Sequence, residues 1–173
     1  MANLPSKDSG VRYRLEGYLF PATYNYGKDT TVKEMIDQML AAMDQNLTPY
    51  YETLESKNIN VNEVLTLASL VEKEGATDQD RKDIASVFYN RLNQDMPLQS
   101  NIAILYAEGK LGQKTTLKED ATIDTELDSP YNIYKNTGLM PGPVDNPGVS
   151  AIEAAVNPSK TDYLYFVANV ENG

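Results

Sequence analysis

The chain has 173 residues, of which 25 are acidic and 15 basic, a formal net charge of −10, and neither histidine nor cysteine. This length fits one domain with a sizeable core, and an apolar fraction of 41% is ordinary for a folded protein. The composition excludes a Ser-His-Asp triad, a thiol nucleophile, a disulfide framework and an ordinary zinc site. The acidic balance excludes nucleic-acid binding through a basic face. Enzyme chemistry here would rest on carboxyl, lysine or tyrosine groups.

The first thirty residues predict one short strand. Apolar and aromatic side chains alternate around Leu15, Tyr18 and Phe20, and Pro21 ends the run. Three helices are predicted next. Thr31 begins the first of these through a capping-box pattern, and its methionines recur at helical spacing, which favours a role in the core.

A helical hairpin is the clearest structural prediction from the sequence. An apolar helix is expected from about Asn60 to Gly75, and Thr77 with Asp80 has the form of a capping box that opens the next helix, which ends near Asn93. Only a few residues separate the two helices, so they are expected to pack against each other.

The rest of the chain is predicted to be irregular, with short elements. Helices are expected at 102–107, after Thr116 and from Ser150, whereas 138–148 contains three prolines and reads as a stiff loop. The run YLYFVAN from Tyr163 is typical of a buried strand. The predicted fold class is therefore α+β: a helical hairpin packed with a small β-sheet and long ordered loops. Loops of this length indicate the ligand surface.

Two glutamates close the first helix of the hairpin, and the sequence pattern does not choose between them. Glu72 and Glu74 each lie at an edge of the buried stripe, while Lys73 points away from both. A carboxyl group in the last turn of a helix is near the negative end of the dipole, and burial adds to this effect. Both effects raise its pKa towards that of a general acid. A solvated helix end remains the alternative.

Other sites receive less support. A two-carboxylate glycosidase would need a second carboxylate, and Asp124, Glu126 and Asp128 are available, but their spacing does not require that role and favours caps and turns. The acidic spacing does not fit a calcium loop. Tyr131 and Tyr134, on either side of Asn132 in SPYNIY, suit a sugar, because rings stack on its CH faces while amides bind its hydroxyls.

Six blocks of the sequence, in order, resemble the endolytic murein transglycosylase family (YceG-like lytic transglycosylases), most closely its streptococcal branch. The resemblance runs from about residue 15 to the end of the chain. The blocks are LEGYLFPATY (15–24), LASLVEKEG (67–75), SVFYNRL (86–92), MPLQSN (96–101), SPYNIYKNTGLMPGPVDNPG (129–148) and AAVNP with YLYFVAN (154–169). Many relatives have Asp-Pro after the LQS block, where this chain has Asn101 and Ile102.

The resemblance implies an enzyme that cuts peptidoglycan strands internally, between N-acetylmuramic acid and N-acetylglucosamine, and leaves 1,6-anhydro-muramic acid ends. It implies that the catalytic general acid/base is the second acid of VEKE, Glu74, and that Tyr134 assists it. Asn90, Gln99, Asn101, Tyr131 and Asn132 are the expected substrate-binding residues. The C6 hydroxyl of the substrate is the nucleophile in this chemistry, so the resemblance implies one essential carboxyl group and no metal or cofactor.

The resemblance also carries expectations about the longer protein. Residues 1–30 are expected to be a remnant of a LysM-like lobe, and 31–173 the catalytic domain. The parent protein is expected to be anchored at the extracellular face of the cytoplasmic membrane, whereas this chain lacks the anchor. Its partners are expected to be glycan strands and proteins of cell-wall synthesis or division, with no nucleic acid. A non-catalytic glycan-binding or scaffolding module, and a hydrolase that uses water, remain alternatives.

Overall fold

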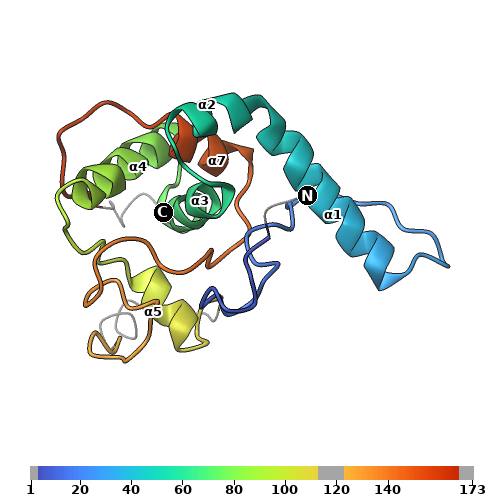
Figure 1. Cartoon of the computed structure of the whole chain (residues 1–173), viewed down its shortest axis with the longest axis horizontal. Helices are drawn as coiled ribbons and strands as arrows, with labels where there is room; N and C mark the ends of the chain where they lie inside the picture. Colours follow the sequence, from blue (N-terminus) through green and yellow to red (C-terminus); the bar gives the residue numbers. More distant parts are fainter. Residues whose placement is uncertain (1–3, 113–122, 168–173) are drawn as a thin grey trace.

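The computed structural model of the chain describes residues 4–112 and 123–167, and the described elements are helical (Figure 1). The helices are α1 (Val32–Leu47), α2 (Tyr51–Ser56), α3 (Val61–Glu74), α4 (Asp78–Leu92), α5 (Asn101–Ala107) and α7 (Val149–Val156), with a 3₁₀ turn at Thr48–Tyr50. Within these ranges, no helix is both long and apolar enough to cross a membrane.

Helix α3 lies at the centre of the fold and packs against α7, α4 and α5 (Figure 1). Every side chain from Val64 to Val71 is buried, because this stretch carries small or apolar residues on all faces of the helix. The two hydroxyl groups in it are hydrogen-bonded locally. Thr66 donates to the carbonyl of Asn62 at 2.6 Å, and Ser69 donates to the carbonyl of Thr66 at 2.8 Å.

The predicted helical hairpin is present. Asn60 and Thr77 cap α3 and α4 through complete capping boxes, as their sequence patterns indicate. Thr31 caps α1 in the same way, and α5 contains the predicted 102–107 helix. Helix α7 begins earlier than predicted, because Gly148 and not Ser150 is its N-cap residue. The helix predicted after Thr116 falls mostly outside the described residues.

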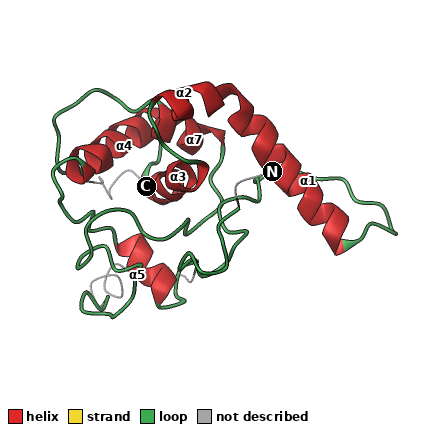
Figure 2. Cartoon of the chain, in the orientation of Figure 1, coloured by secondary structure: helices red, strands yellow, loops and turns green. Residues whose placement is uncertain are grey.

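The α+β prediction is wrong: the structure is all-α over the described residues, and no sheet is present in them (Figure 2). The first predicted strand is a series of turns, in which the backbone amide of Tyr18 donates to the carbonyl of Leu15 at 3.0 Å. The alternating pattern arises because the Tyr18 side chain turns into the core, where it is 1% exposed. The second predicted strand, from Tyr163, has no partner strand among the described residues. Side chains of α4 bind its carbonyl groups instead.

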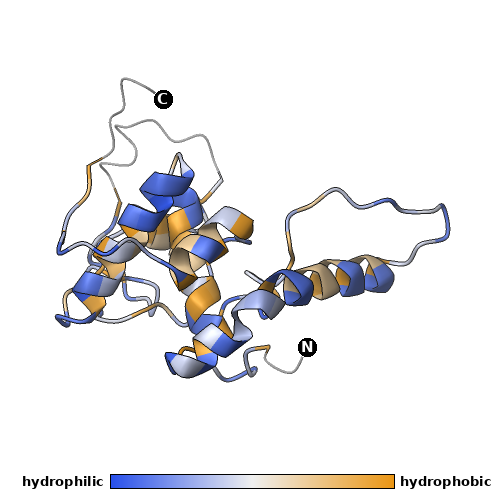
Figure 3. Cartoon of the chain, turned by 90° about the horizontal axis from the view of Figure 1, so that it is seen from above, coloured by the Kyte–Doolittle hydropathy of each residue, from blue (hydrophilic) through white to orange (hydrophobic). Residues whose placement is uncertain are grey.

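Helix α1 extends away from the rest of the molecule, with the loop of residues 20–31 returning alongside it (Figures 1 and 3). Its C-terminal half joins the core through Met43 and Leu47, which are 0% and 2% exposed. At the far end Val32 is 71% exposed. The predicted core role of the α1 methionines therefore holds fully only for Met43.

The N-terminal segment is fixed to the 138–148 loop. The side-chain oxygen of Asn146 accepts hydrogen bonds from the amides of Gly17 and Leu19, at 2.8 and 3.0 Å. Gly17 has a φ of +84°, and a Cβ atom there would lie 2.3 Å from Cγ of Pro143. Only glycine fits this position, because it accepts the left-handed conformation and leaves room for the proline ring.

Replacing Gly17 with alanine is expected to lower the free energy of unfolding by roughly 2–4 kcal/mol, through backbone strain and overpacking together. Gly138→Ala is the matched control, because Gly138 has a φ of +86° and open space at its Cβ position. The control should lose only about 1 kcal/mol, the cost of the backbone conformation. Urea denaturation of the two variants measures the difference. Equal losses would show that the N-terminal segment does not fold against the loop.

Candidate active site

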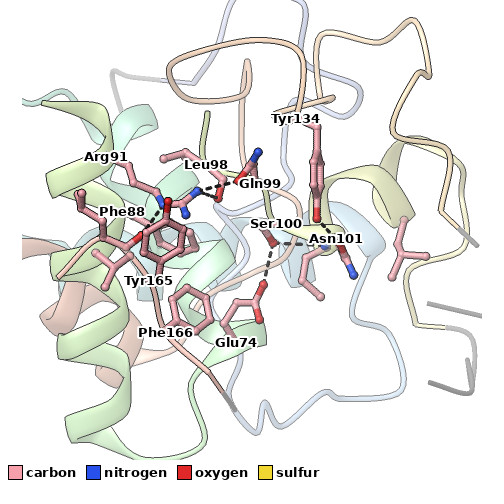
Figure 4. Close-up of a pocket in the computed structure, with 14 residues that line it drawn as sticks. Glu74, Phe88, Arg91, Leu98, Gln99, Ser100, Asn101, Tyr134, Tyr165 and Phe166 are labelled. Atoms are coloured by element: carbon pink, nitrogen blue, oxygen red, sulfur yellow. Dashed lines mark hydrogen bonds between the residues drawn. The ribbon is translucent and has the colours of Figure 1, made fainter. Parts of the chain in front are cut away.

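A cavity of about 460 Å³ lies beside the end of α3 (Figure 4). Four of the predicted site residues line it, namely Glu74, Gln99, Asn101 and Tyr134. Glu74 ends α3, Asn101 begins α5 and Gln99 lies two residues before it. Tyr134 belongs to the loop after Pro130. These segments are far apart in the sequence, so the tertiary fold assembles the site.

The structure separates the two glutamates that the sequence pattern left equivalent. Glu74 lines the cavity, whereas Glu72 faces α4 and α7. One carboxylate oxygen of Glu72 lies 3.6 Å from the guanidinium of Arg81, and the other accepts a hydrogen bond from the amide of Gly148 at 3.0 Å. Glu72 thus links α3 to α4 and to the N-terminus of α7, and has a structural role.

Gly75 allows α4 to pass close to the end of α3. A Cβ atom at this position would lie 2.5 Å from Cγ and 3.1 Å from Cα of Arg81. The residue has a φ of −93°, so its conformation is open to any amino acid and the requirement for glycine is steric. The close approach brings Arg81 to Glu72 and leaves the Glu74 side chain free to turn into the cavity.

The carboxyl group of Glu74 has a single hydrogen-bond partner among the described side chains. The hydroxyl of Ser100 donates to it at 2.7 Å, and no basic side chain of the described residues forms an ion pair with it. Burial raises the pKa of Glu74 above its usual value, and the hydrogen bond from Ser100 offsets only part of this effect. A carboxyl group held in this way keeps its proton to a higher pH than an exposed one, as a general acid requires.

Ser100 joins the cavity to α5. It is the N-cap residue of that helix, and its hydroxyl oxygen accepts a hydrogen bond from the amide of Ile102 at 3.3 Å. The same hydroxyl donates its hydrogen to Glu74, so one atom both caps the helix and orients the carboxyl group (Figure 4). The sequence reasoning missed this residue, although a serine just before a predicted helix is a recognisable N-cap signal.

Tyr134 stands across the cavity from the end of α4, and its hydroxyl donates to the side-chain oxygen of Asn101 at 2.5 Å (Figure 4). Burial is the main cause that raises the pKa of Tyr134, and the nearby charge of Glu74 adds to it. The phenol is therefore neutral at physiological pH. Its backbone is positioned by Asn132, whose side-chain oxygen accepts from the amide of Tyr134 at 3.0 Å.

The three other predicted substrate-binding residues do not line this cavity. Asn132 is fully buried and donates to the carbonyls of Thr125 and Leu127, which shapes the loop. Tyr131 is 4% exposed, and its hydroxyl accepts from the amide of Arg12 at 3.1 Å. Asn90 donates to two carbonyls of the C-terminal segment, those of Thr161 and Tyr163.

Arg91 and the segment Leu164–Phe166 form the other wall of the cavity, and the sequence reasoning missed both. Arg91 is 5% exposed and donates to the carbonyl of Pro97 at 2.9 Å and to the side-chain oxygen of Gln99 at 3.3 Å. The segment's apolar and aromatic residues predict a buried strand. No local pattern indicates that it lies beside Glu74.

Comparisons with known proteins show the family of the chain. The model of the YceG-like family matches residues 2–173. The chain belongs to the YceG-like family. It is 68% identical over 173 residues to the endolytic murein transglycosylase of Streptococcus pneumoniae serotype 2 (strain D39). The matched region is the whole of this chain and 31% of the relative's length. The family resemblance and its streptococcal character are thus confirmed.

Two further relatives extend the comparison. An endolytic murein transglycosylase of Bacillus subtilis (strain 168) is 46% identical over 162 residues, which are 93% of this chain and 44% of the relative. The crystal structure of a YceG-like protein from Listeria monocytogenes superposes with a TM-score of 0.85 at 48% identity, over 96% of this chain and 53% of that one. The chain therefore spans between about a third and half of the proteins it matches.

Replacing Ser100 with alanine is expected to raise the pKa of Glu74 further, because the variant loses the hydroxyl that stabilises the charged carboxylate. Carbon-detected NMR of the glutamate side chains, with Glu74→Gln to assign the signal, measures this pKa. Thr66→Ala is the control, since it also removes a helix-associated hydroxyl but does not contact Glu74. An unchanged or lower pKa in Ser100→Ala would contradict the assigned hydrogen bond.

Glu74→Gln is expected to stabilise the fold at neutral pH. Because the pKa of Glu74 is higher in the folded than in the unfolded state, the folded protein binds the extra proton between the two values, and stability falls as pH rises through that window. Glutamine removes this loss. Its advantage should vanish below the unfolded pKa, near 4.3. Denaturation at pH 4 and pH 7.5 tests this, and an equal effect at both values would contradict it.

Proposed function

We propose that this chain carries the catalytic site of an endolytic murein transglycosylase, which cuts peptidoglycan strands between N-acetylmuramic acid and N-acetylglucosamine and leaves 1,6-anhydro-muramic acid ends. One observation carries the proposal: the Glu74 carboxyl group faces a cavity, partly buried, with a raised pKa and a hydroxyl as its hydrogen-bond partner. The names of the relatives support the same activity for the family.

Glu74 serves as general acid and then as general base. In its protonated form it gives a proton to the glycosidic oxygen, and the bond to the anomeric carbon of the muramic acid breaks. The C6 hydroxyl of the same sugar attacks that carbon, and the carboxylate of Glu74 takes the C6 proton. The carboxyl group returns to its starting state, so a single residue serves both steps. The hydrogen bond from Ser100 keeps a carboxyl oxygen of Glu74 in place throughout.

The described lining of the cavity contains one carboxyl group, as this mechanism requires. Among the residues described as lining it, Glu74 is the acidic side chain. Asp124 accepts a hydrogen bond from the amide of Glu126 at 2.9 Å, as turn residues do, and neither residue lines the cavity. This arrangement favours an intramolecular nucleophile over the two-carboxylate scheme, in which a second carboxylate activates water.

We assign to Tyr134 the role of stabilising the charge that develops in the transition state. Its neutral phenol donates to Asn101, and no described group donates a hydrogen bond to the hydroxyl oxygen, so its lone pairs are available in the cavity. An oxygen in that position stabilises the positive charge that develops on the sugar ring. Gln99 and Asn101 contribute amide groups that suit the hydroxyl and acetamido groups of the substrate.

The location and partners follow from the substrate. Since peptidoglycan lies outside the cytoplasmic membrane, we place the site on the extracellular side, within a longer protein that acts beside cell-wall synthesis or division proteins. We assign the catalytic role to residues 31–173. We propose that the segment before residue 31 is the remnant of a LysM-like lobe, whose Tyr18 side chain packs into the core.

Digestion of purified peptidoglycan followed by mass spectrometry of the products tests the activity. The chain should cut glycan strands internally and leave anhydro ends. Glu74→Gln should lower the rate at which these ends form by roughly 10²–10⁴-fold, the usual contribution of an acid/base group. Glu72→Gln is the matched control, two residues away on the same helix and outside the cavity, and it should keep the activity. Reducing ends would show hydrolysis, and an absence of new ends would show a binding module; either result contradicts the proposal.

Tyr134→Phe is expected to lower the rate less than Glu74→Gln, by roughly 10-fold to 10²-fold, because it removes one polar oxygen and keeps the ring. The loss should fall mainly on kcat, since the oxygen acts on developing charge. Tyr131→Phe removes a hydroxyl from the same loop but not from the cavity, and should change kcat by less. If the two variants have equal rates, Tyr134 does not have this role.

A further inference from the structure

Tyr165 is an exposed aromatic residue that is nevertheless held in one place. Its side chain is 69% exposed, so burial contributes little to its position. The guanidinium carbon of Arg91 lies 4.8 Å from the centre of its ring, and Nε of Arg91 donates to the carbonyl of the preceding residue, Leu164, at 2.7 Å. The ring is fixed at the edge of the cavity that contains Glu74.

Arg91 is the buried residue that holds this wall of the cavity in place through its hydrogen bonds. It is 5% exposed, and the carboxylates of the described residues form no ion pair with it. Its donors are used instead on the carbonyls of Pro97, Leu98 and Leu164 and on the side chain of Gln99. One buried cation thereby fixes both the aromatic residue and an amide group that face the same space (Figure 4).

The Tyr165 ring is not needed to hold its own segment. Asn90 donates to the carbonyls of Thr161 and Tyr163 at 2.9 Å each, and the hydroxyls of Ser86 and Thr161 are hydrogen-bonded at 2.8 Å. Phe166 packs edge-on against Phe88 with ring centres 5.8 Å apart. These contacts secure the backbone on both sides of Tyr165, so the exposed ring has no structural task that would explain its fixed position.

We propose that Tyr165 is a sugar-stacking residue, on which the CH face of an N-acetylhexosamine unit of the glycan rests while the adjacent glycosidic bond lies at Glu74. One face of the ring contacts Arg91, and its exposed surface is available to the sugar. Figure 4 shows Tyr165 and Tyr134 on opposite sides of the Glu74–Ser100 pair, so the strand passes between two aromatic residues. This inference rests on the proposed function and defines how the site holds its substrate.

Binding of soluble glycan strands in the Glu74→Gln background, which prevents turnover, tests the proposal. Adding Tyr165→Ala should weaken binding by about tenfold, whereas Tyr165→Phe, which keeps the stacking surface, should stay within about twofold. Tyr163→Ala is the matched control, because Tyr163 is 61% exposed, lies two residues away and does not line the cavity. Its Kd should equal that of the background protein. The urea midpoint of each variant confirms that it is folded.

The outcomes separate this inference from the proposed function. Unchanged binding by Tyr165→Ala, or an equal loss in Tyr163→Ala, overturns the stacking role even if the parent chain forms anhydro ends. Loss of binding in Tyr165→Ala alone supports it, even if the parent chain forms none and acts only as a binding module. A Tyr165→Phe variant as weak as Tyr165→Ala would show that the hydroxyl binds and the ring does not, and so would also overturn it.

Discussion

The site depends on one constraint: the carboxyl group of Glu74 ends a helix whose stretch from Val64 to Val71 is buried on every face. Helix α3 has small and apolar side chains all round, so α7, α4 and α5 can pack against it and exclude water. Glu74 lies three residues after this stretch, at the boundary between the core and the cavity. Desolvation at this boundary raises its pKa.

The neighbours of Glu74 are arranged so that it stays unpaired. Arg81 approaches α3 closely over Gly75, but it binds Glu72. Lys73 forms an ion pair with Asp145 at 2.8 Å, and Arg91 donates to carbonyl groups. The cationic side chains around the end of α3 are thus occupied elsewhere. A basic partner would have stabilised the charged form of Glu74 and lowered its pKa, so that less of the carboxyl group would be protonated at neutral pH and able to act as a general acid.

The irregular parts of the chain form the remaining walls. The loop after Pro130 brings Tyr134, the residues before α5 bring Ser100 and Gln99, and the C-terminal segment brings Tyr165. Each is fixed by hydrogen bonds from buried side chains, chiefly those of Asn132 and Arg91, and not by regular secondary structure. Loops anchored in this way are rigid enough to align substrate groups, while their exposed side chains remain free to contact it.

The sequence by itself determined the helices around the site, because capping boxes and helical periodicity are local signals, and these correctly placed the starts of α1, α3 and α4. It also reduced the possible chemistry to carboxyl, lysine and tyrosine groups, and motif blocks indicated the family. It did not exclude a sheet, since the alternation around Tyr18 and the run at Tyr163 match strands locally. Only the tertiary structure shows that turns near Tyr18, and side chains of α4 near Tyr163, form the hydrogen bonds to the backbone that a sheet would otherwise form. It likewise placed Glu74 at the cavity and Glu72 against Arg81, and it brought Ser100, Arg91 and Tyr165 to the cavity. These contacts join residues far apart in the chain, where no local pattern records them.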